Sequence, residues 1–87
     1  MQADKTQISR LIKTARGQLD GVLRMVEDDR YCLDIVNQIL AAQAILKKAN
    51  REILRAHLDT CVTSAVEANN AKEKIGELVD LFDKMTK

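Results

Sequence analysis

The chain has 87 residues, of which 46% are hydrophobic and 31% charged, a balance that fits one small globular domain over residues 1–87. It has no proline, no tryptophan, three glycines and 2% aromatic residues. This excludes most sandwiches, barrels and Rossmann domains, because those folds need frequent turns. The formal net charge of +1 conceals a segregation of charge, since residues 1–24 and 47–59 are basic and residues 25–34 are acidic.

No apolar run approaches the roughly 20 residues of a membrane span, and no signal peptide opens the chain. We therefore expect a cytoplasmic helical protein with no membrane partner. A single chain this short, with one phenylalanine and one tyrosine, has a thin core, so we also expect it to form oligomers.

The first predicted helix runs through residues 8–26, where apolar residues recur every three or four positions. Gly17 and Gly21 are four residues apart and share one face of this helix. A second helix could approach closely there, or the two glycines are tolerated surface residues, and the sequence does not separate these readings.

A break follows at residues 27–31, where we expect an aspartate to cap the next helix. Nothing stops a helix from Cys32 to about Ala68, which at 1.5 Å per residue would be roughly 55 Å long. Most positions from Leu33 to Leu46 are apolar. One flanking helix cannot cover so wide a surface, so other chains are expected to cover it.

A turn at Asn69-Asn70 leads into a third predicted helix that begins at Ala71 or Lys72. Its expected buried face consists of Ile75, Leu78, Val79 and Phe82. The predicted fold is therefore all-α: one short helix, one very long central helix and one shorter helix, assembled as an oligomer.

Two cysteines and one histidine are the candidate metal ligands of this sequence. His57 and Cys61 are four residues apart and form a two-ligand half-site for a soft metal. Cys32 lies 29 residues before Cys61, about 43 Å away on a straight helix. An antiparallel pair of chains crossing near residue 45 brings Cys32 of one beside His57 and Cys61 of the other, giving two sites per dimer.

The plainer reading is that the cysteines are inert small hydrophobic residues and the histidine is a surface group. A structural disulfide is not expected in this compartment. His57 and Cys61 have no evident orienting acid or oxyanion donor in the sequence, so the chain is not expected to be an enzyme.

The chain also carries four short motifs: Arg-Gly-Gln at 16–18, Glu-Asp-Asp-Arg-Tyr-Cys at 27–32, Gln-Ile at 38–39 and His-Leu-Asp-Thr-Cys at 57–61. With these motifs it resembles the copper-sensitive operon repressor (CsoR) family over about residues 8–82. The resemblance implies three-helix protomers that form antiparallel dimers and then a dimer of dimers, a flat homotetramer. It also implies a repressor that binds double-stranded operator DNA and is released by its inducer.

Carried over to this chain, the resemblance makes Cys32, His57 and Cys61 the inducer ligands, with Cys32 from the neighbouring protomer. It makes Tyr31 and Glu77 the groups that hold the histidine and pass the signal to the third helix. Two thiolates and one imidazole suit Cu(I), bound at one ion per protomer, whereas Zn(II) prefers a fourth ligand. The expected outcome is derepression of copper-efflux genes.

Other branches of the family are less well matched. Nickel and cobalt sensors draw on additional histidines, but His57 is the only histidine here. Formaldehyde sensors lack the equivalent of Cys61. A persulfide sensor that joins Cys32 to Cys61 through sulfane sulfur remains the main alternative. A further alternative is a copper buffer or scaffold that does not bind DNA.

Two groups of basic residues support DNA binding independently of the resemblance, because such side chains contact phosphates. The expected contacts are Arg16, Lys13, Lys48, Arg10 and Arg51. The sequence departs from the family in the first helix, where Arg10 lies one position early and Leu11 takes the usual place of the arginine. Arg16 and Lys48 are therefore preferred to Arg10.

Overall fold

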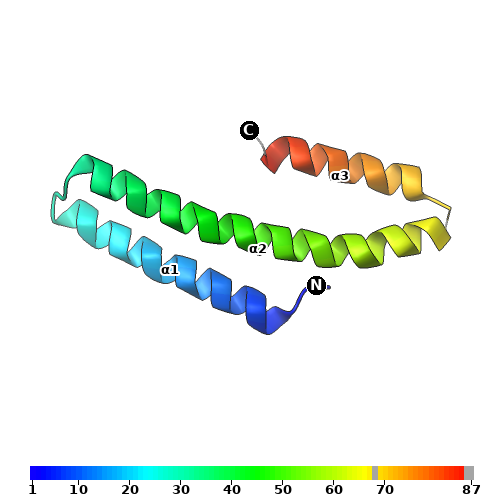
Figure 1. Cartoon of the computed structure of the whole chain (residues 1–87), viewed down its shortest axis with the longest axis horizontal. Helices are drawn as coiled ribbons and strands as arrows, with labels where there is room; N and C mark the ends of the chain where they lie inside the picture. The colour runs from blue at the N-terminus through cyan, green and yellow to red at the C-terminus, as the bar shows by residue number, and fades with distance from the viewer. Residues whose placement is uncertain (68, 86–87) are drawn as a thin grey trace.

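The computed structural model describes residues 1–67 and 69–85, except for the side chains of residues 61, 62 and 65. These residues form three helices and no strand: α1 (Lys5–Glu27), α2 (Cys32–Glu67) and α3 (Ala71–Met85). Figure 1 shows α2 in the middle, with α1 along one of its sides and α3 folded back along the other. The all-α prediction is confirmed, and the predicted start of each helix lies within three residues of the observed one.

Helix α1 has well-defined caps. At its start, the Asp4 carboxylate accepts hydrogen bonds from the backbone N–H groups of Thr6 (2.9 Å) and Gln7 (3.4 Å). At its end, Asp29 adopts a left-handed conformation with φ 51°, and the N–H of Arg30 bonds to the carbonyl of Met25 at 3.0 Å. This is a Schellman ending in which an aspartate stands where glycine is usual.

The expected aspartate cap on the second helix is wrong. Asp28 and Asp29 serve to end α1, as described above. Helix α2 begins instead at the carbonyl of Tyr31, which accepts from the N–H groups of Asp34 (3.0 Å) and Ile35 (3.2 Å). The reason is the tightness of the connection: only four residues separate the two helices, and closing the first helix uses most of them.

Helix α2 continues unbroken for 36 residues, because its interior has neither glycine nor proline. Although it is longer than a bilayer is thick, none of the described helices combines the length and hydropathy of a membrane span.

The buried core is small and lies between α1 and α2. Its buried hydrophobic residues are Ile8, Ala15, Val22, Ala42 and Ala49. The alanines let the two helix backbones approach closely, but they bury little apolar area. A methyl group added at Gly17 or Gly21 would meet no heavy atom within 4 Å, so no described part of the chain uses the close approach that these glycines permit.

Of the other two helices, α3 packs only on α2. The expected buried face of α3 is wrong for the single chain, since Ile75, Val79 and Phe82 are 52%, 53% and 47% exposed and only Leu78 is half-buried. The apolar pattern of α3 is real, but one neighbouring helix covers only part of it.

The molecule is elongated, with a radius of gyration of 17.3 Å and extents of 56 × 28 × 13 Å. A compact domain of this length has a radius of gyration of about 12 Å. Its accessible surface of 6812 Å² exceeds by about 1,600 Å² the roughly 5,200 Å² expected for a compact protein of this mass. The predicted thin core is confirmed.

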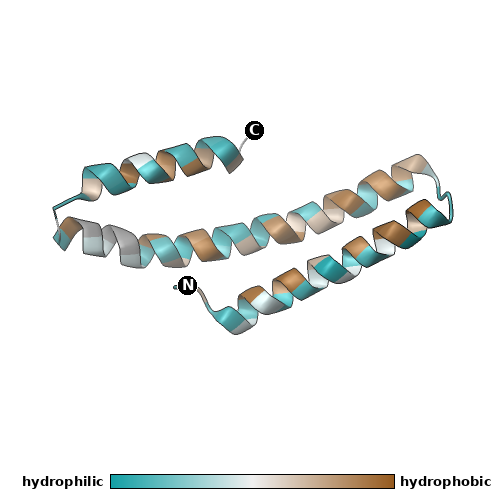
Figure 2. Ribbon diagram, turned by 180° about the vertical axis from the view of Figure 1, so that it is seen from behind, coloured by the Kyte–Doolittle hydropathy of each residue, from teal (hydrophilic) through white to brown (hydrophobic). Residues whose placement is uncertain are grey.

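Much of the excess surface is apolar. Exposed hydrophobic residues of α1 and of the first half of α2 form a surface that we call the open apolar face. These residues are Ile12, Leu19, Leu23, Val26, Leu33, Val36, Ile39, Leu40 and Leu46. Figure 2 shows hydrophobic residues recurring along both helices. Helical phase puts the α1 residues, Ile39 and Leu46 on the same side of the α1–α2 hairpin, with Leu33, Val36 and Leu40 next to them.

Candidate functional site

Cys32 and His57 occupy the two ends of one line along α2. Both side chains are exposed. They are 25 residues apart, so at about 100° and 1.5 Å per residue they lie within about 20° of the same line and about 37 Å apart. This line runs along the open apolar face through Ile39.

No single chain can bring these groups to one ion. Among the described residues, no cluster of three histidine, cysteine or acidic side chains is close enough to hold a metal. The third predicted ligand, Cys61, is one whose side chain lies outside the described residues, although α2 runs through its position. The predicted three-ligand site therefore stays a prediction.

The donor chemistry suits a soft ion. The Cys32 thiol is free and exposed, so a metal ion can reach its sulfur without a change of fold. His57 lines a cavity of about 350 Å³ between the N-terminal residues, α2 and α3. The His57 side chain is exposed, and a neutral imidazole offers one of its ring nitrogens as a ligand.

The two residues predicted to hold the histidine lie elsewhere in the single chain. Tyr31 is 65% exposed at the start of α2, far along the helix from His57. The Glu77 carboxylate on α3 lies 3.6 Å from the Lys74 ammonium. The part of α3 that shares a cavity with His57 is its last turns, through Leu81 and Met85.

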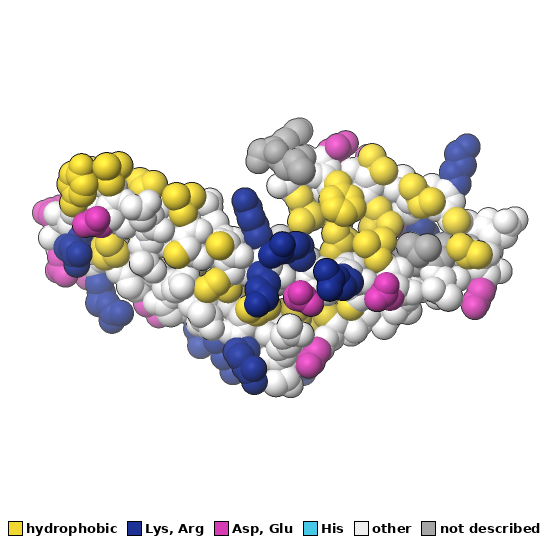
Figure 3. Space-filling view, viewed as in Figure 1, with side chains coloured by type: hydrophobic (Ala, Val, Ile, Leu, Met, Phe, Trp, Pro, Cys, Tyr) yellow, Lys and Arg dark blue, Asp and Glu magenta, His cyan; other side chains and the backbone are white. Residues whose placement is uncertain are grey.

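The five predicted DNA contacts lie on the surface: Arg10, Lys13, Arg16, Lys48 and Arg51. The basic residues of α1 and those of α2 point away from the contact between the two helices, so they form two separate groups. Figure 3 shows basic side chains over α1 at the lower edge and over α2 in the centre. By helical phase, Lys48 lies opposite the open apolar face, which leaves it accessible if that face is covered.

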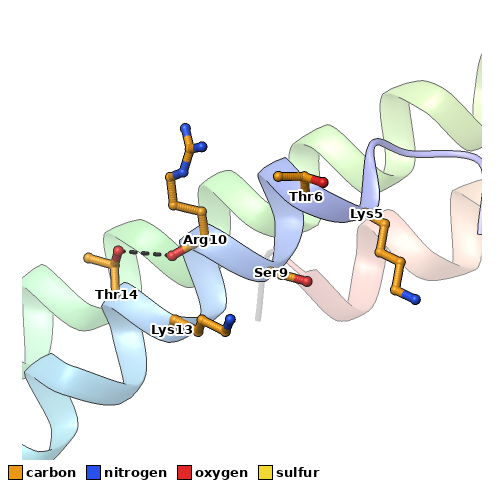
Figure 4. A pocket seen from close by; sticks show the side chains of 6 residues that line it. All are labelled: Lys5, Thr6, Ser9, Arg10, Lys13 and Thr14. Atoms are coloured by element: carbon orange, nitrogen blue, oxygen red, sulfur yellow. Dashed lines mark hydrogen bonds between the residues drawn. The ribbon is translucent and has the colours of Figure 1, made fainter.

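The first turns of α1 also form a shallow polar cavity of about 600 Å³. Two predicted contacts, Arg10 and Lys13, line this cavity together with Lys5 and three hydroxyl residues, Thr6, Ser9 and Thr14. Figure 4 shows Lys5, Ser9 and Lys13 on one side of the helix and Arg10 on another, with the Thr14 hydroxyl donating to the Arg10 carbonyl at 2.9 Å. The three hydroxyl residues were missed in the sequence, but the four-residue spacing of Lys5, Ser9 and Lys13 is a signal that could have revealed this row.

Several known proteins are similar to this chain in sequence. The copper-sensing transcriptional repressor CsoR of Bacillus subtilis (strain 168) is 42% identical over 84 residues, covering 97% of this chain and 83% of that protein. CsoR of Mycobacterium ulcerans is 48% identical over 69 residues, covering 79% of this chain. The match spans 59% of the length of the M. ulcerans protein.

Two solved structures share the fold. The copper-sensing repressor CsoR with Cu(I) from Geobacillus thermodenitrificans NG80-2 superposes with a TM-score of 0.86 at 34% identity, covering 100% of this chain and 94% of that one. The nickel-responsive regulator InrS gives a TM-score of 0.80 at 26% identity, covering 97% and 94%. Residues 4–84 match the family of metal-sensitive transcriptional repressors. The chain is therefore a member of this repressor family.

Proposed function

We propose that this protein is a copper-responsive repressor that binds operator DNA in its metal-free form and leaves it when Cu(I) binds. In this proposal the working unit is an antiparallel homodimer, and two dimers pair as a tetramer. Each Cu(I) is held by Cys32 of one protomer with His57 and Cys61 of its partner. Release from DNA then derepresses copper-efflux genes in the cytoplasm.

The observation that carries the proposal is the position of Cys32 and His57 on α2. They share one line of a single helix, about 37 Å apart, and the open apolar face lies along that line. Two helices packed antiparallel along this face put the Cys32 end of each against the His57 end of the other. The same contact that covers the apolar side chains thus completes the ligand set.

The three copper-sensing relatives named above support copper as the inducer, and the ligand types agree. Thiolate sulfur and imidazole nitrogen are soft or intermediate ligands, which suit Cu(I). Each site would hold two thiolates and one imidazole per ion. Cu(I) supplies the attraction that holds these three groups together.

The chain's own residues would turn binding into release from DNA. Drawing Cys32 toward the partner's half-site moves the start of α2, where Tyr31 is located. Fixing the His57 ring constrains its neighbours on α3, and Glu77 lies one turn from Leu81 in that helix. The basic groups of α1 and those of α2 would then be displaced relative to one another. By linkage, Cu(I) weakens DNA binding by the same factor by which DNA weakens Cu(I) binding.

The test is fluorescence anisotropy of the protein on its own promoter fragment, titrated without oxygen with Cu(I). We expect release at about one Cu(I) per protomer. Cys32→Ser and His57→Ala should keep DNA binding but lose most of the response to Cu(I). Ser64→Ala, an exposed polar change on the same helix, is the matched control and should respond like the wild type.

The other outcomes identify the alternatives. DNA binding that ignores Cu(I) but is lost on addition of polysulfide would overturn copper sensing in favour of a persulfide sensor. Cu(I) binding without any retention of the promoter at low salt would indicate a copper buffer. A normal response by His57→Ala would show that the histidine does not transmit the signal.

A further inference from the structure

The cavity beside His57 also contains two methionines from opposite ends of the chain. Met1 lies before α1, and Met85 is the last residue of α3. Figure 1 shows the N-terminus on the α1 side of α2 and the last turn of α3 on the other side, both near the middle of α2. The sequence has three methionines and one histidine, so two of the three thioethers line the same cavity as the only imidazole.

These three side chains favour a soft metal ion over a hard one. Thioether sulfur is a soft, uncharged ligand that favours Cu(I), and imidazole binds copper readily. The other residues that line the cavity are Gln2, Asn50, Ile53, Leu54 and Leu81. None of these is acidic, so the cavity offers no carboxylate oxygen to a hard divalent cation such as Mg²⁺ or Ca²⁺.

The mobility of the ligands suits the size of the cavity. A volume of about 350 Å³ is much larger than one ion, so the side chains must close around it. Methionine is unbranched, with three rotatable bonds. Met1 is 73% exposed and Met85 half-buried, so neither side chain is fixed within the core, and His57 is carried by a long continuous helix.

We propose that Met1, His57 and Met85 form a second Cu(I) site within a single protomer. This site deepens the proposed function, on which its choice of metal rests. Because it shares His57 with the three-ligand site between protomers, the two cannot be filled at the same histidine together. The thioethers hold an arriving ion beside the imidazole until the thiolates of Cys32 and Cys61 replace them. In that exchange two neutral sulfur ligands leave, and the two thiols release their protons to solvent.

The test isolates this site by removing the thiols. The full-length Cys32→Ser/Cys61→Ser protein is labelled with selenomethionine and loaded anaerobically with Cu(I) supplied as its acetonitrile complex. X-ray absorption at the selenium edge should show copper at bonding distance. Met85→Leu in this background should lower the Cu(I) affinity by about tenfold or more, since loss of an outer-shell partner alone costs 10- to 100-fold.

Met25 provides the matched control, because it is the third methionine and lies near the end of α1, outside this cavity. Met25→Leu should leave both the selenium–copper signal and the affinity unchanged. A selenium–copper signal that does not weaken in Met85→Leu would overturn the assignment, as would copper bound only through nitrogen or oxygen.

This readout is independent of DNA. If the wild type stayed on DNA in the presence of Cu(I) but the selenium–copper contact were present, the proposed repressor function would be contradicted and the Met1–His57–Met85 site would be supported. If release were normal and the selenium–copper contact absent, the reverse would hold.

Discussion

Covering the open apolar face in a dimer should stabilise the dimer by an amount that can be worked out for Ile39. This residue is 39% exposed in the single chain and lies on the line that joins Cys32 to His57. Burying a whole isoleucine side chain is worth about 1.5–3 kcal/mol. Covering the remaining two-fifths therefore contributes about 0.6–1.2 kcal/mol per protomer, and a twofold axis doubles this to about 1.2–2.4 kcal/mol per dimer.

Ile39→Ala should accordingly raise the dimer dissociation constant by about 7- to 50-fold, at 1.4 kcal/mol for each factor of ten. Sedimentation velocity over a range of protein concentrations measures this directly. Val66→Ala is the control, since Val66 is also an exposed aliphatic residue of α2, at 63%, but lies away from the open apolar face. If both variants dimerised like the wild type, the proposed contact along this line of α2 would be refuted.

Three further predictions concern the caps, the turn and the basic surface. Asp4→Ala removes the acceptor for two N–H groups at the start of α1 and should lower the unfolding free energy by about 1 kcal/mol, measured by urea denaturation. Asp29→Val puts a β-branched residue at φ 51° and should cost about 1–2 kcal/mol in the same assay, whereas an unchanged midpoint would contradict the strain argument. Lys13→Ala should lower the slope of log K against log salt for promoter binding by about 0.9 for each phosphate that the protein no longer neutralises. Lys72→Ala on α3 should leave that slope unchanged.

The helices were predictable because their signals are local. The absence of glycine and proline from residue 32 to residue 67 is sufficient to predict one long helix. The role of Asp28 and Asp29 was not predictable in the same way. An aspartate is compatible both with a helix start and with a left-handed helix end, and the short connection decided between the two.

Burial was harder to predict, because the same apolar pattern arises whether a helix packs on its own chain or on another chain. Ile75, Val79 and Phe82 have the spacing of a buried face, yet each remains about half exposed when only α2 lies beside them. The same holds for the candidate site. The spacing of Cys32 and His57 could be read from the sequence, but the cavity that joins His57 to Met1 and Met85 depends on how the two ends of the chain fold back.

The length of α2 also limits how two bound ions could influence each other. In an antiparallel dimer the two sites would be separated by about the Cys32–His57 spacing of 37 Å. Charges interact weakly beyond the Debye length, which is about 8 Å at physiological ionic strength. Direct repulsion between two Cu(I) ions would therefore be negligible. Any cooperativity in copper binding by this protein would report a change in the shape of the dimer, transmitted along the helix that carries both half-sites.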